Sequence, residues 1–132
     1  MLINNLYTIQ SVTHAENEIQ VAANLLTDHD IFKGHFPGHP VLPGVCMMEM
    51  VAEMTGEYLK NSFRIKGSPL IKFLRMIDPR RNSLIQFEIK YQFVSGAVIT
   101  SGRIYSGAEI FMKFQLNLIS ELQSDRHTGV RV

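Results

Sequence analysis

The sequence predicts an α+β fold in which an antiparallel sheet wraps around one long helix. Two observations support this prediction. Segments in which apolar and polar residues alternate, as in half-buried strands, recur along the chain. Only the segment 44–60 has the length and composition of a substantial helix, and its side chains are apolar nearly all round. We therefore expect this helix to be buried against the sheet in a single core.

Five segments are predicted to be strands: 19–25, 70–77, 85–93, 97–105 and 110–118. The segment 85–93 has the clearest alternation, and its apolar residues are expected to share one face. The turn dipeptides Ser95-Gly96 and Ser106-Gly107 separate the last three segments. Short turns of this kind predict an antiparallel meander.

The predicted helix follows a loop that is rich in proline and glycine. Pro43 suits the first helical turn, where a missing N–H group costs nothing. The prolines before it bias the loop toward extended geometry. We expect a stiff loop that presents its side chains to the start of the helix.

Length and composition are those of one soluble domain spanning residues 1–132. The net charge of +1 gives no reason to expect a nucleic-acid partner. The single cysteine and the lack of a secretory signal pattern predict a cytoplasmic protein. No apolar run is long enough to predict a membrane span, and the polar segment 120–132 is expected to be a flexible tail.

The stretch KGHFPGHPVLPGVCMMEM, residues 33–50, places groups with complementary chemistry close together in the sequence. A carboxyl group among methionines, as at Glu49, is costly to ionise and can act as a general acid. A neutral imidazole, as in His35, can act as the base. The amides of Gly44 and Val45 begin a helix and can donate to a developing oxyanion. From these residues alone, a structural loop and a carboxyl group paired in the core remain alternatives.

The run HFPGHPVLPGVCMMEM resembles the signature of the 3-hydroxyacyl-[acyl carrier protein] dehydratases, which are hot-dog enzymes. The resemblance implies that His35 and Glu49 are catalytic and that the Gly44 amide binds the thioester carbonyl, with Val45 and Phe36 beside the substrate. It implies no cofactor and no metal. It also implies homodimers, or trimers of such dimers, in which the His and Glu of one site come from different subunits.

The activity implied is that of a lyase that converts a (3R)-3-hydroxyacyl thioester on acyl carrier protein to the trans-2-enoyl thioester, in fatty-acid or polyene-type biosynthesis. Glutamate rather than aspartate at position 49 favours the plain dehydratase branch over the dehydratase-isomerase branch. The alternatives are a hot-dog acyl thioesterase and a non-catalytic subunit that binds the acyl carrier.

Three departures from the family pattern leave the acyl substrate open. An N-terminal His-Arg-Tyr-Pro-Phe run is absent, Glu53 occupies a position that is often Gln, and the usual Pro-Gly-Asp turn is replaced by Pro79-Arg80-Arg81-Asn82. Glu53 and Glu57 are expected to lie on a solvated or interface edge of the helix.

Two further groups of residues have candidate roles. His35, His39 and Cys46 could be drawn as metal ligands, but no fourth ligand is apparent, and Cys46 is expected to pack in the helix. Six basic residues could form a rim that attracts an acidic carrier protein: Arg64, Lys66, Lys72, Arg75, Arg80 and Arg81.

Overall fold

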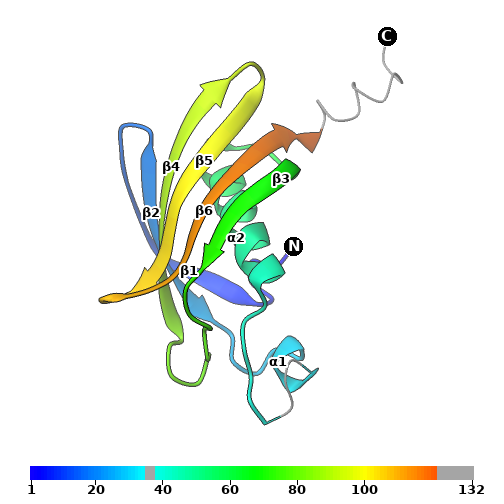
Figure 1. The fold of residues 1–132 in the computed structure, drawn as a ribbon, viewed down its shortest axis with the longest axis vertical. Helices are drawn as coiled ribbons and strands as arrows, with labels where there is room; N and C mark the ends of the chain where they lie inside the picture. The colour runs from blue at the N-terminus through cyan, green and yellow to red at the C-terminus, as the bar shows by residue number, and fades with distance from the viewer. Residues whose placement is uncertain (35–37, 122–132) are drawn as a thin grey trace.

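A computed structural model describes residues 1–34 and 38–121 of the protein. It contains one six-stranded sheet and two helices in this part of the chain. In chain order the elements are β1 (Tyr7–Ala15), β2 (Glu18–Leu25), α1 (Ile31–Gly34), α2 (Gly44–Leu59), β3 (Phe63–Phe73), β4 (Leu84–Val94), β5 (Ala97–Ser106) and β6 (Glu109–Ser120). The sheet order is β1-β2-β4-β5-β6-β3, and neighbouring strands are antiparallel. Figure 1 shows α2 lying along one side of the curved sheet, which confirms the predicted fold class.

The meander β4-β5-β6 is the part of the sheet that the sequence predicts best. Val94 pairs with Ala97 across a two-residue turn, and Ser95 and Gly96 both have positive φ values, 48° and 79°. Two successive left-handed residues match the twist of the flanking strands in a tight hairpin. The turn between β5 and β6 uses Gly107 at φ 58°. Both predicted turn dipeptides therefore lie at hairpins.

The core lies between α2 and the inner face of the sheet. In β4, Ile85, Phe87 and Ile89 are at most 1% exposed, as their alternation predicts. Phe93 belongs to the same face, yet 68% of its surface is exposed, because this end of β4 extends beyond the cover of the helix. The prediction of a shared buried face is therefore correct for the first part of the strand and wrong for its end.

Four elements differ from the predictions. The strand predicted at 70–77 is β3, which begins at Phe63 and ends at Phe73. The edge strand β1 and the short helix α1 were not predicted. Ser120 was expected to belong to a flexible tail, but it is the last residue of β6 and pairs with Phe63; residues 122–132 lie outside the described ranges.

Helix α2 matches its predicted bounds to within one residue and begins directly after Pro43, whose φ of −63° suits that position. Its burial is less complete than expected. Met50, Val51, Ala52 and Met54 are buried, but Val45 is 67% exposed, so one stripe of the helix faces away from the sheet. Within the described ranges, no helix has the length and hydropathy needed to cross a lipid bilayer.

Candidate active site

The N-terminus of α2 provides hydrogen-bond donors at a defined point. The amides of Cys46 and Met47 both donate to the Pro43 carbonyl, at 3.0 and 3.2 Å. The amides of Gly44 and Val45 come before this first helical bond, as the leading amides of a helix do. They also lie at the positive end of the helix dipole. This arrangement suits the binding of an oxygen atom that gains negative charge.

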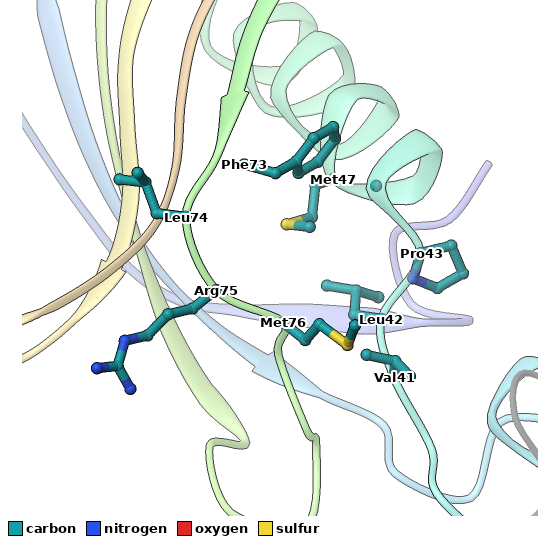
Figure 2. A pocket seen from close by; sticks show the side chains of 9 residues that line it. Val41, Leu42, Pro43, Met47, Phe73, Leu74, Arg75 and Met76 are labelled. Carbon is teal, nitrogen blue, oxygen red and sulfur yellow. The ribbon is translucent and has the colours of Figure 1, made fainter.

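An apolar pocket of about 540 Å³ opens beside these donors. We call it the Gly44 pocket, and it is lined by Val41, Leu42, Pro43, Gly44, Met47, Phe73, Leu74, Arg75 and Met76. Figure 2 shows the Met47, Met76 and Leu42 side chains gathered around the same space, and the Arg75 guanidinium extending away from it. Its lining comes from α2, from the loop before it, and from the end of β3 and the segment that follows this strand, so it lies where helix and sheet meet.

At the edge of this pocket the Phe73 ring lies against the backbone of Gly44. A Cβ atom at position 44 would lie 2.5 Å from Phe73 Cζ and 2.6 Å from Cε1. A real Cβ contact does not come this close, so any larger residue would displace the ring. The sequence therefore uses glycine where the wall of the pocket meets the first helical amide.

Glu49 lies on the exposed stripe of α2, contrary to the expectation of a carboxyl group buried among methionines. The neighbouring Met47 and Met50 are buried because they point to the other side of the helix, toward the sheet. The pKa of Glu49 is nevertheless raised. The surrounding atoms partly desolvate the carboxyl group, and the charges of Glu53 and Glu121 oppose its ionisation, while the Met1 amino group acts in the opposite direction.

Gly44 and Glu49 do not line the same cavity. Glu49 contributes to a second cavity of about 650 Å³, which we call the Glu49 hollow. Its lining is Met1, Glu49, Ala52, Glu53, Gly56, Glu57, Lys60, Asn61, Ser62, Phe63, Arg64 and Glu121. Residues five apart on a helix point in directions about 140° apart, which explains the separation. Within one chain the donor and the carboxyl group are thus on different sides of α2.

His35 and Phe36, the other predicted site residues, lie outside the described residues. The backbone on either side of them is described: α1 ends at Gly34, and the loop that leads to α2 is described from Gly38 onward. The Leu42 amide donates to the Ile77 carbonyl at 2.9 Å and holds this loop beside the segment that connects β3 to β4. The roles of His35 and Phe36 remain predictions.

The six basic residues that were predicted to form a rim do not lie on one surface. Arg75 lines the Gly44 pocket, and its guanidinium forms an ion pair with Glu109 at 2.9 Å. Arg64 lines the Glu49 hollow, and Lys72 lies beside Lys113 in a separate depression on β3 and β6.

Arg80 is held near the loop that precedes α2. It forms an ion pair with Asp78 at 3.0 Å and donates a hydrogen bond to the Gly38 carbonyl at 3.4 Å. Lys66 and Arg81 are exposed. Of the six, Arg75 is the one that lines the Gly44 pocket.

Glu53 contradicts the expectation of a solvated edge, because it is only 8% exposed. Its carboxylate accepts hydrogen bonds from the backbone amides of Leu2 and Ile3, at 2.8 and 2.9 Å, and from the Tyr7 hydroxyl at 3.2 Å. Figure 1 shows the N-terminus beside α2. No local pattern in the sequence indicates this contact, because the partners are separated from Glu53 by 46 or more positions.

Cys46 is buried, and desolvation followed by the charge of Glu49 raises the pKa of its thiol. This agrees with a packing role and argues against the lowered thiol pKa that a helix N-terminus can produce. Across residues 1–34 and 38–121, no three His, Cys, Asp or Glu side chains are grouped so that they could hold a metal ion.

Comparison with known proteins identifies related sequences. The family model of the ApeI-like proteins, described as ApeI dehydratase, matches residues 11–103. The 3-hydroxyacyl-[acyl-carrier-protein] dehydratase FabZ of Clostridium acetobutylicum is 34% identical over 80 residues, which are 55% of this chain and 55% of that protein. FabZ of Lactococcus lactis is 32% identical over 100 residues, 67% of this chain and 66% of that protein. The chain thus spans between about half and two thirds of the length of these relatives.

Among solved structures, a dehydratase heterocomplex, ApeI:P from Xenorhabdus doucetiae, has a chain with a similar fold. The TM-score is 0.68 at 19% sequence identity, and the match covers 84% of this chain and 96% of that one. This similarity confirms the predicted hot-dog arrangement of sheet and helix. The family model covers well over half of the sequence, and the chain belongs to the ApeI-like dehydratase family.

Proposed function

We propose that the protein is a lyase that dehydrates a (3R)-3-hydroxyacyl thioester, carried on the phosphopantetheine arm of acyl carrier protein, to the trans-2-enoyl thioester. Membership of a dehydratase family supports the reaction class, and the FabZ relatives support the carrier-bound substrate. The single observation that carries the proposal is the apolar Gly44 pocket, which opens beside two helix-terminal amides.

The pocket suits the acyl chain and the thioester carbonyl of this substrate. Transfer of an acyl chain from water to contact with apolar walls such as Met47 and Phe73 is favourable. A thioester carbonyl oxygen beside the Gly44 amide accepts a hydrogen bond that strengthens as the oxygen becomes enolate-like. The binding site therefore also supplies transition-state stabilisation.

The proposed reaction consists of two proton transfers and one bond cleavage. Neutral His35 removes a proton from C2, and the Gly44 amide stabilises the enolate-like thioester oxygen. The C3–O bond then breaks as protonated Glu49 donates its proton to the departing hydroxyl, which leaves as water. The proton held by His35 returns to Glu49 through solvent to complete the cycle, so the reaction needs no cofactor.

A second copy of the chain would complete this site. Gly44 and Glu49 lie in separate cavities of one chain, whereas the mechanism requires both at one substrate. The exposed Val45 and Glu49 form a stripe of α2 on which a partner can pack. We infer a homodimer in which Glu49 of one subunit faces the Gly44 pocket of the other. A trimer of such dimers is compatible with this arrangement.

The reaction is tested by incubating the purified protein with a 3-hydroxyacyl carrier protein. Formation of the conjugated enoyl thioester is followed by its absorbance, and a thiol reagent is present in a parallel sample. We expect the absorbance to rise without thiol release. Thiol release would instead indicate a thioesterase, and carrier binding without either signal would indicate a non-catalytic subunit. If the pure protein is inactive and a different hot-dog subunit restores activity, the active form is a heterocomplex rather than a homodimer.

Replacement of Arg75 by glutamate tests whether the pocket rim attracts the acidic carrier protein. We expect kcat/KM for the carrier-bound substrate to fall about tenfold at low salt, because charge reversal opposes the approach of an acidic partner. The same acyl group on free pantetheine should react at the wild-type rate. Lys113→Glu, an equal change beside the depression on β3 and β6, is the control. Equal losses with both substrates would rule out a docking role.

A further inference from the structure

The hydrogen bonds of Glu53 have a consequence for the neighbouring Glu49. We propose that Glu53 is a positioning residue: anchored by the Leu2 and Ile3 amides and the Tyr7 hydroxyl, it holds a negative charge one helical turn from Glu49 and favours the protonated form of that carboxyl group in the general-acid step. This inference rests on the proposed function, in which Glu49 is the acid.

The three donors satisfy Glu53 in its ionised form. Backbone amides can only donate hydrogen bonds, and a carboxylate accepts several at once. The Tyr7 hydroxyl is also kept as a donor, because burial and then the charge of Glu53 raise the pKa of this fully buried side chain far above its usual value. The Glu53 carboxylate is therefore fixed in position and held away from bulk solvent.

The position of Glu53 brings this charge close to Glu49. Residues four apart on an α-helix lie on the same face, about 6 Å apart along the axis, and both glutamates line the Glu49 hollow. Protein atoms around a buried charge screen it less than water does, so a neighbouring carboxyl group loses more by ionising. Glu53 is the larger of the two charge effects that raise the pKa of Glu49; that of Glu121 is smaller.

Other charged groups around the hollow act in both directions. They are Glu53 and Glu57 from α2, Lys60 at the C-cap of that helix, Arg64 from β3, Glu121 after β6 and the amino group of Met1. Glu57 and Glu121 are exposed, so solvent screens their charges. Glu53 differs from these acidic neighbours in being buried and held by three donors, which is why we assign the effect to it.

The test is a titration of Glu49 in the intact protein, followed by NMR of side-chain-labelled glutamate in the absence of substrate. We expect Glu53→Gln, which removes the charge at nearly constant shape, to move the Glu49 midpoint to lower pH. In assays, the alkaline limb of the pH profile of kcat should also move to lower pH, because Glu49 then loses its proton at a lower pH. Each half-unit of this displacement lowers kcat on that limb roughly threefold.

Two control variants separate charge from structure. Glu57→Gln removes the same charge from an exposed site one turn further along α2 and should move the midpoint less. Tyr7→Phe weakens the anchor but keeps the charge, so the midpoint should stay near its wild-type value. A midpoint that is unchanged in Glu53→Gln, or one that moves equally in either control, would overturn the proposal.

The wild-type protein offers a second readout that does not depend on the Glu53→Gln variant folding. If the two groups interact strongly, the Glu53 resonance shows an inflection at the pH where Glu49 titrates, and its absence would contradict the coupling. Failure of the proposed function is distinguishable: an inactive wild-type protein with the expected titration refutes the reaction alone. An active protein in which Glu53→Gln does not move the Glu49 midpoint would refute only this inference.

Discussion

Replacement of Glu49 by glutamine is expected to lower kcat for dehydration by about 10²- to 10⁴-fold, the usual contribution of a general acid or base. Glutamine keeps the shape of the side chain but cannot donate a proton to the departing hydroxyl. The side chain is exposed in the single chain, so its replacement should leave the melting temperature almost unchanged. The measurement is a comparison of kcat and thermal unfolding in the variant and the wild-type protein.

Two further variants provide the comparison for this result. Glu57→Gln makes the same change at an exposed position two turns further along α2 and should retain wild-type activity. His35→Ala removes the predicted base and should lower kcat to a similar extent. Turnover near the wild-type level in Glu49→Gln would reject the assignment of this residue. A mixture of inactive Glu49→Gln and His35→Ala chains that regains activity would support sites formed between subunits.

Replacement of Gly102 by alanine is expected to have the largest effect on stability. Gly102 lies in the middle of β5, where it pairs with Ile89 on one side and Phe114 on the other. An added Cβ atom would overlap the Glu88 carbonyl oxygen, and it would lie 2.9 Å from the carbonyl carbon. Because backbone atoms in a central strand cannot move aside cheaply, we expect a loss of about 3 kcal/mol in the free energy of unfolding.

Thermal unfolding measures this effect, and for a chain of this size such a loss lowers the melting temperature by about 10 °C. Gly34→Ala is the matched control, because no atom lies within 4 Å of a Cβ atom built at that position. It should change the melting temperature by no more than a few degrees. A Gly102→Ala protein as stable as the control would show that β4 and β5 are further apart than the structure places them.

The sequence determined the elements that depend on neighbouring residues. Helix α2 was predictable because a proline-rich stop precedes a long apolar run. Both hairpins of the meander were predictable because Ser95-Gly96 and Gly107 supply the positive φ values that the turns require. The family motif also indicated the reaction class, which the match to the ApeI-like dehydratases supports. In each case a short stretch contains all the information.

Strands at the edges of the sheet were harder to predict. β1 is mostly exposed and carries polar residues on both faces, so it lacks the alternation of a half-buried strand. In β3, the run Gly67-Ser68-Pro69 has the composition of a turn, yet the strand continues past it with a change of register because β6 pairs with both halves. These strands form because a partner strand supplies hydrogen bonds, and the identity of the partner is not a local property.

Only the tertiary structure decided how the candidate site is arranged. The sequence placed Glu49 and Glu53 on one helix, but it did not indicate that the chain's first residues would return to cover Glu53 and leave Glu49 exposed. Nor did it indicate that Gly44 and Glu49 line different cavities. Periodicity reports which face of an element is apolar, whereas the contacts that decide the ionisation of a carboxyl group join residues far apart in the chain.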